Sequence, residues 1–149
     1  MEKVREFLDS IRFFKSFSDD EKRRLSNIKN IYLRFLPGEP IILEGQIEQA
    51  LYVVLKGNAV VNKKGLEGLI ISCLGPGSVF GEISLIQEQP RTTNVIAEGE
   101  VVVMKMEKAT VETLDDALQK KFNEQLIRVL VERLEEMNQK YINAMFFNL

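Results

Sequence analysis

Residues 74–95 read LGPGSVFGEISLIQEQPRTTNV, and this stretch combines sharp turns with two charged side chains of opposite sign. Glycines at positions 75, 77 and 81 let the backbone turn tightly and approach a ligand closely. Glu82–Ile86 is predicted to form one turn of helix, whose first N–H groups would be free to meet an anion. Arg91 follows the rigid Pro90, and a guanidinium can hold two oxygens of one phosphate.

The carboxylate of Glu82 narrows the kind of ligand that this stretch suits. A carboxylate repels a phosphate at contact, so Glu82 fits better as an acceptor for a sugar hydroxyl. Together with Arg91, it indicates a small ligand that carries both a phosphate and a hydroxyl. The alternative is a surface turn held by an ion pair between Glu82 and Arg91, because so short a pattern is not specific by itself.

Around this stretch, residues 31–107 have the pattern of a β-rich domain. Ile31, Leu33 and Phe35 alternate with their neighbours, and glycines lie between or beside the later apolar runs. Short strands are predicted at 40–43, 51–55, 59–62, 69–74, 93–97 and 101–106. Many short strands with regular turns are typical of a β-barrel or a double-sheet roll. Cys73 lies inside one predicted strand and is expected to be a small buried hydrophobe.

Helices are predicted on both sides of this β-roll. Residues 1–30 show helical spacing of apolar side chains, and Ser18 and Glu21 have the spacing of a capping box. The aromatic side chains of Phe13, Phe14 and Phe17 are expected to pack inside the protein. A short helix is predicted at 110–114.

A long helix is predicted to follow, with Asp115 and Asp116 at its positive end. No Gly or Pro interrupts the chain from residue 118 to about 145. Apolar side chains on this helix form a seven-residue repeat: Ile127, Leu130, Leu134, Met137, Tyr141 and Ala144. A second stripe comprises Phe122, Leu126 and Val129. We expect one stripe to pair two copies as a homodimer; the alternative is that both stripes cover the chain's own barrel. The whole of 1–149 is interpreted as one domain.

The composition excludes several classes of function. The net charge of −2 gives no electrostatic reason to bind nucleic acid or an anionic membrane. The absence of histidine excludes Ser-His-Asp and Cys-His catalysis, as well as the imidazole ligands of a cupin-like metalloenzyme. No apolar run approaches the roughly 20 residues that span a bilayer, and the N-terminus lacks a secretory signal. The single cysteine fits a reducing compartment. We therefore expect a cytoplasmic, non-enzymatic domain without a metal or cofactor.

Residues 80–85 (FGEISL) and 90–95 (PRTTNV) resemble the phosphate-binding cassette of the cyclic nucleotide-binding domain family. That family includes the regulatory subunits of cyclic-AMP-dependent protein kinase and the bacterial catabolite activator protein. The resemblance continues through residues 36–39 and 44–61 and into the final helices, so that 108–149 would be the hinge and lid helices of the family. It implies a mainly β fold, a double-stranded β-helix (a jelly-roll-like barrel, or β-roll) with N-terminal helices, a short cassette helix within residues 80–95 and a long C-terminal helix.

The resemblance also implies roles for particular residues. Glu82 would accept a bond from the ribose 2′-hydroxyl, and Arg91 would hold the exocyclic phosphate oxygens. Val61, Ile71 and Ser72 would line the base pocket, although aliphatic residues on a barrel strand are as often simple core. The implied ligand-binding set is Gly81, Glu82, Ile83, Ser84, Arg91, Thr92, Thr93, Val61, Ile71, Ser72 and Arg133.

Two positions depart from the family pattern. Residues 46–48 (QIE) replace the usual Asp-x-Gly, which predicts a different turn rather than a different site. Thr93 stands where Ala is common and adds a hydroxyl near the phosphate. By the same resemblance, Thr92 can bond the 2-amino group of a guanine without selecting it, so cyclic GMP stays open beside cyclic AMP, which we favour.

The expected function is a cyclic nucleotide sensor that signals by moving its C-terminal helix. Its output would go to an unknown effector protein or a fused effector domain, and no DNA-binding segment is expected after the long helix. The alternative is a dimerisation or scaffold module that keeps the fold but binds no nucleotide.

Overall fold

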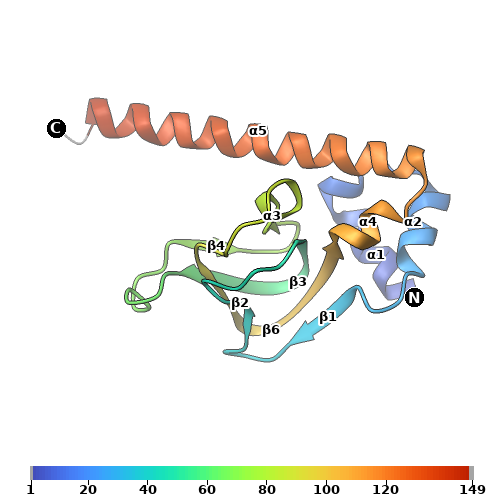
Figure 1. The fold of residues 1–149 in the computed structure, drawn as a ribbon, viewed down its shortest axis with the longest axis horizontal. Coiled ribbons are helices and arrows are strands. Elements are labelled where there is room, and N and C mark those ends of the chain that lie inside the picture. Colours follow the sequence, from blue (N-terminus) through green and yellow to red (C-terminus); the bar gives the residue numbers. More distant parts are fainter. Residues whose placement is uncertain (1, 148–149) are drawn as a thin grey trace. The chain divides into compact units, whose positions relative to one another are not determined.

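The computed structural model describes residues 2–147, and the chain divides into two compact units between Leu114 and Asp115 (Figure 1). The first unit holds the N-terminal helices, all strands of the sheet and the helices α3 and α4. The second unit holds the helix α5. None of the helices in residues 2–147 combines the length and the apolar composition that crossing a bilayer requires.

The first unit begins with α1 (Glu2–Ser10), a 3-10 turn (Arg12–Phe14) and α2 (Asp19–Ser26). The predicted capping box at α2 is confirmed. The Glu21 N–H donates to Ser18 Oγ at 3.1 Å, and the Ser18 N–H donates to Glu21 Oε1 at 2.8 Å. These two bonds satisfy backbone donors that the start of a helix otherwise leaves unpaired.

The side chains of Phe13, Phe14 and Phe17 are buried, as predicted. The Phe14 ring meets Phe13 and Phe17 edge to face, with centroid distances of 5.1 and 5.5 Å. This is the favoured geometry for aromatic pairs, and it joins the turn between α1 and α2 into a small aromatic core.

The sheet is antiparallel throughout the named strands, and the strand order is β1-β6-β3-β4, with β2 paired to β6 and β5 to β3. The strands are β1 (Tyr32–Phe35), β2 (Pro40–Ile42), β3 (Ala50–Asn62), β4 (Ser72–Leu74), β5 (Val79–Phe80) and β6 (Asn94–Glu107). Figure 1 shows α1, α2 and α4 gathered at the end of the sheet where β6 finishes. The expected architecture, a β-roll with flanking helices, is confirmed.

The long strands β3 and β6 form the centre of the roll. The sequence predicted two strands in place of each, separated by a glycine, but the structure has one strand that bends. The register of the pair shifts on both sides of Lys56, next to Gly57, whose φ is +86°. A Cβ on Gly57 would lie 2.2 Å from the carbonyl oxygen of Glu100, so only glycine allows the two backbones to approach this closely. The chain therefore turns the corner of the roll without ending the strand.

Side chains from every strand of the sheet except β1 form the buried core, with Leu33, Phe35 and Val61 packed against it. Its members are Ile41, Ile42, Ala50, Tyr52, Val54, Ala59, Leu74, Phe80, Val95, Ala97, Val101 and Val103.

Two predictions around β4 were wrong. The strand predicted at 69–74 covers only Ser72–Leu74, and the apolar side chains of Leu69, Ile70 and Ile71 are exposed. Cys73 is exposed rather than buried. The physical reason is that β4 lies at the end of the strand order, so successive side chains alternate between the core and the outside. Leu74 takes the buried position and Cys73 the outer one.

Short helices close the first unit, and the second unit is a single long helix. These are α3 (Ile83–Ile86), α4 (Lys108–Glu112) and α5 (Asp116–Phe147). The start of α5 is confirmed near the predicted acidic pair, because Asp115 Oδ1 accepts the Leu118 N–H at 2.9 Å. The seven-residue repeat lies on this uninterrupted helix, and pairing of two copies along it stays a prediction.

Candidate functional site

The backbone of Arg91 is held by the loop that precedes β3. The Arg91 N–H donates to the Gln46 carbonyl at 2.8 Å, and the Arg91 carbonyl accepts the Gly45 N–H at 2.7 Å. A bridge between Ile47 and Pro90 lies beside these bonds. Two segments more than 40 residues apart in the sequence are therefore joined at Arg91, the residue predicted to bind a phosphate.

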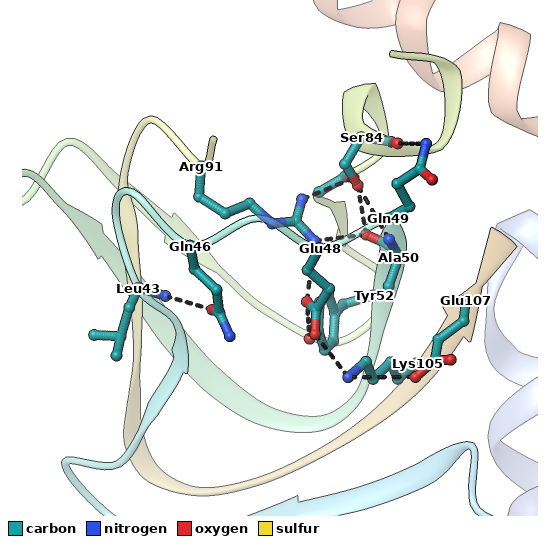
Figure 2. Close-up of polar contacts among 11 residues, drawn as sticks. Leu43, Gln46, Glu48, Gln49, Ala50, Tyr52, Ser84, Arg91, Lys105 and Glu107 are labelled. Atoms are coloured by element: carbon teal, nitrogen blue, oxygen red, sulfur yellow. Dashed lines mark hydrogen bonds and ion pairs between the residues drawn. The ribbon is translucent and has the colours of Figure 1, made fainter. Parts of the chain in front are cut away.

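The guanidinium of Arg91 is buried, with 8% of the residue exposed. Figure 2 shows it pointing from the cassette toward the start of β3. Nη1 donates to the Gly81 carbonyl at 3.1 Å, and Nη2 donates to the Ala50 carbonyl at 2.8 Å and to Glu48 Oε1 at 3.2 Å. The remaining donor, Nε, is buried and has no hydrogen-bond partner within residues 2–147. A buried donor without an acceptor costs free energy, so Nε marks a place for an acceptor that the chain does not supply.

Gly81 allows this arrangement because it has no side chain. Its φ is +77°, a left-handed conformation that glycine adopts readily. A Cβ there would lie 2.8 Å from Arg91 Nη1 and 3.1 Å from the Ala50 carbonyl oxygen. The glycine of the predicted cassette is therefore required both by the backbone conformation and by the closeness of the arginine.

Ser84 ties the cassette helix to β3. Its Oγ lies 2.8 Å from the Gly81 carbonyl oxygen and 2.9 Å from that of Ala50, and it accepts the Ala50 N–H at 3.2 Å. Ser84 is itself buried, and its hydroxyl contacts the same two carbonyls that accept hydrogen bonds from Arg91. The structure therefore gives Ser84 a bracing position beneath the site.

The predicted hydroxyl acceptor, Glu82, lies between Gly81 and Ser84, immediately before α3, and is buried with 3% of the residue exposed. Charged side chains are almost never fully buried unless they are paired. Ile83 begins α3 and is exposed. The cassette helix itself, predicted for residues 82–86, is confirmed over residues 83–86.

Thr92 and Thr93 lead from Arg91 into β6. Thr92 is exposed and its carbonyl accepts a bond from Lys63 Nζ at 2.8 Å, while Thr93 is half-buried. Strand pairing places Ser72 opposite Val61, and Val61 opposite Val95.

The three predicted base-pocket residues lie together. The Ile71 N–H donates to the Val61 carbonyl at 2.8 Å, and Ser72 is the partner of Val61 on β4. Ile71 and Ser72 are exposed and Val61 is half-buried, so none of the three is a fully buried core residue. Their contact with a base stays a prediction. Arg133 lies on α5, in the second unit, and its role in a nucleotide site also stays a prediction.

Glu48 is the site residue that the sequence reasoning missed. It belongs to the 46–48 turn, which was expected to leave the site unchanged; that expectation was wrong, because its carboxylate contacts Arg91. Glu48 also accepts the Tyr52 hydroxyl at 2.6 Å and lies 2.8 Å from Lys105 Nζ. Burial raises the pKa of Glu48, but bonds from Lys105 and Tyr52, the Lys105 charge and Arg91 together bring the pKa below its ordinary value. Glu48 is therefore a carboxylate at neutral pH. Its replacement of the family glycine was the available signal.

Burial and the negative charge of Glu48 also affect the pKa of Tyr52. Desolvation first, and then the bond to Glu48 and its charge, raise the pKa of the Tyr52 hydroxyl well above its ordinary value. Tyr52 is therefore a neutral donor over the whole physiological range.

The structure is thus an antiparallel β-roll with a buried glutamate and a buried arginine beside its short cassette helix. The family model for the cyclic nucleotide-binding domain matches residues 32–117. The chain belongs to this family.

Relatives and solved structures agree with that assignment. The chain is 35% identical over 94 residues to a cGMP-dependent protein kinase of Toxoplasma gondii, covering 63% of the chain and 9% of the kinase. It is 27% identical over 114 residues to a CRP-like cAMP-activated global transcriptional regulator of Mycobacterium tuberculosis, covering 75% of the chain and 50% of the regulator. A cyclic nucleotide-binding domain from Methylobacillus flagellatus matches the fold with a TM-score of 0.77 at 22% identity, over 96% of this chain and 83% of that one. The chain thus spans half or less of the length of these two curated relatives.

Proposed function

We propose that this chain is a cyclic nucleotide sensor in which Arg91 receives the cyclic phosphate and Glu82 receives the ribose 2′-hydroxyl. One observation carries the proposal: the buried Arg91 guanidinium is fixed by backbone carbonyls and retains a buried Nε donor that no described residue accepts. An anionic oxygen is the partner that such a donor prefers. Domains of this family are regulatory, and the proposed role is likewise regulation without catalysis.

The names of the relatives do not indicate which base this chain prefers. One is named as cGMP-dependent and another as cAMP-activated, so both nucleotides are candidate ligands for this chain. We favour cyclic AMP, and cyclic GMP stays a candidate because the Thr92 hydroxyl permits a bond to guanine without requiring it. That single bond changes the affinity by roughly tenfold at most.

One contact favours the alternative function, a scaffold module that binds no nucleotide. Glu48 Oε1 already accepts from Arg91 Nη2, so part of the guanidinium has an internal anionic partner. The alternative predicts that added cyclic nucleotide leaves the protein's stability unchanged.

Thermal unfolding with cyclic AMP, cyclic GMP, 5′-AMP and 5′-GMP separates the two functions. A ligand at 100 times its dissociation constant adds about 2.7 kcal/mol of stability, which raises the Tm by several degrees in a chain of this size. We expect a rise with a cyclic nucleotide, a smaller one with the linear nucleotides, and none with Arg91→Ala. Calorimetric titration should show Arg91→Ala weakening binding by about 2–5 kcal/mol, or roughly 30-fold or more. Unchanged Tm values in wild type with every nucleotide would support the scaffold function.

The regulatory step that we propose is an ordering of α5 by the bound nucleotide. A ligand shifts a conformational equilibrium only if it interacts unequally with the two states. The nucleotide must therefore bind more tightly to the state in which α5 is ordered. Hydrogen exchange in residues 118–135 should slow when nucleotide binds. Protection confined to residues 80–95 would show a binding site without this switch.

A further inference from the structure

The carboxylate of Glu48 lies between two cations that come from different parts of the fold. Its Oε1 is 3.2 Å from Arg91 Nη2, and its Oε2 is 2.8 Å from Lys105 Nζ (Figure 2). The Tyr52 hydroxyl donates to Oε1 at 2.6 Å. Both carboxylate oxygens are therefore occupied, and Glu48 cannot turn away from Arg91 without losing its other bonds.

Strand register fixes the donors that hold Glu48. Tyr52 and Lys105 are directly opposite each other on β3 and β6, and Lys105 Nζ lies 5.8 Å from the centre of the Tyr52 ring. On its other side, Tyr52 pairs with Phe80 of β5, and the two rings are stacked with a centroid distance of 5.1 Å. Phe80 immediately precedes Gly81, whose carbonyl receives Arg91. Tyr52 and Lys105 thus belong to the rigid sheet on which the site rests.

Lys105 changes the net charge of the cluster around Arg91, where an anion would bind. Glu48 beside Arg91 alone would cancel the positive charge that attracts a phosphate. Lys105 adds a second positive charge, so the three groups sum to +1. The carboxylate of Glu107, 3.7 Å from Lys105, has a side chain that is 58% exposed, and water and salt screen its charge.

We propose that Lys105 and Tyr52 are positioning residues for anion binding at Arg91, and that both act through Glu48. The inference rests on the proposed function, since it assigns the groups that position Arg91, the residue proposed to bind the phosphate, and that offset the charge of Glu48 beside it. Lys105 occupies one oxygen of Glu48 and offsets its charge, and Tyr52 orients the other oxygen. The Arg91 guanidinium then keeps one geometry, with Nε left for the ligand.

Titration of Lys105→Met with cyclic AMP and cyclic GMP tests this role. The variant should bind both nucleotides about three- to tenfold more weakly, which reaches beyond the upper end of the range for an exposed ion pair because the Lys105 side chain is only 21% exposed. Lys105→Arg should restore the affinity, because it keeps the charge. Tyr52→Phe should give a smaller loss in both nucleotides. Lys56→Met is the matched control: it removes the same charge from an exposed position of β3 and should leave the affinity within twofold.

A second measurement tests the positioning without nucleotide. The Arg91 Nε–H signal in the ¹⁵N spectrum, assigned by its loss in Arg91→Lys, should move in Lys105→Met and stay in place in Lys56→Met. An unmoved signal in Lys105→Met, or wild-type affinity in that variant while Arg91→Ala fails to bind, would overturn the proposal. If wild type binds neither nucleotide, the proposed function itself falls, and with it the role of these residues in anion binding.

Discussion

Replacing Gly81 with alanine tests whether the cassette glycine is required by the backbone alone or also by the arginine beside it. Any L-residue at a φ of +77° is strained by about 1–2 kcal/mol. The added methyl group would also lie 2.8 Å from Arg91 Nη1 and 3.1 Å from the Ala50 carbonyl oxygen. The carbonyl belongs to a buried strand and cannot move far, so the guanidinium must shift. Overpacking of this kind costs a further 1–3 kcal/mol, roughly.

A control with the same strain and no contact is available in the chain. Gly38 has a φ of +83°, and a Cβ on it would meet no atom within 4 Å. Gly38→Ala should therefore lose only the conformational part, about 1–2 kcal/mol of unfolding free energy. Gly81→Ala should lose about 2–5 kcal/mol in total. The difference between the two variants isolates the contact with Arg91 and Ala50.

The assay is urea unfolding of both variants, followed by titration with cyclic nucleotide of each variant that is folded. Displacement of the guanidinium should weaken binding in Gly81→Ala by about tenfold or more, while Gly38→Ala should bind as wild type does. Equal losses of stability in the two variants, together with unchanged affinity in Gly81→Ala, would refute the argument. The Arg91 side chain would then be free to move aside at no cost.

Three further perturbations address the base, the assembly and the internal carboxylate. Thr92→Ala, titrated with both nucleotides, should weaken cyclic GMP alone if the hydroxyl bonds guanine; equal losses would assign Thr92 to the phosphate cradle. Leu134→Glu should convert a dimer to a monomer in analytical ultracentrifugation, while Gln139→Glu, off the apolar repeat of α5, should leave the dimer intact; a monomeric wild type at tens of micromolar would contradict the pairing. Glu48→Gln should be less stable than wild type near neutral pH. Because folding lowers the pKa of Glu48 below its ordinary value of 4.5, its ionisation stabilises the fold above that pH, and the difference in Tm should close as the pH falls below it. A difference that persists unchanged at pH 3 would exclude the ionised contact as its source.

The parts of the fold that follow local rules could be predicted from the sequence. The capping box at Ser18 depends on two residues three positions apart, and the alternation of β1 depends on neighbours in one strand. The cassette helix after Gly81 is similarly local, since a glycine turn and a short apolar run suffice to place it. Each of these features draws its stability from groups within a few residues of one another.

The failures occurred where pairing over a distance decides the outcome. The apolar run 69–74 has strand composition throughout, but β3 pairs with β4 only from Ala59 to Val61, so the run becomes a strand only at its end. The two residues of β5 are too few to show any periodicity. In both cases the partner strand sets the boundary, and no window of local sequence contains the partner.

The contact between Glu48 and Arg91 at the candidate site also depends on residues far apart in the sequence, and this contact bears on function. The family resemblance located Arg91 and Glu82 because their spacing within the cassette is local. It could not show that a carboxylate 43 residues earlier reaches the guanidinium, because that contact depends on how the 46–48 turn is joined to Arg91 by two backbone bonds. Since Glu48 competes for the same cation that a phosphate would use, the affinity of this site depends on residues outside the cassette. A cassette match therefore predicts where a nucleotide would bind, whereas we propose that Glu48 and the donors that hold it set the strength of binding.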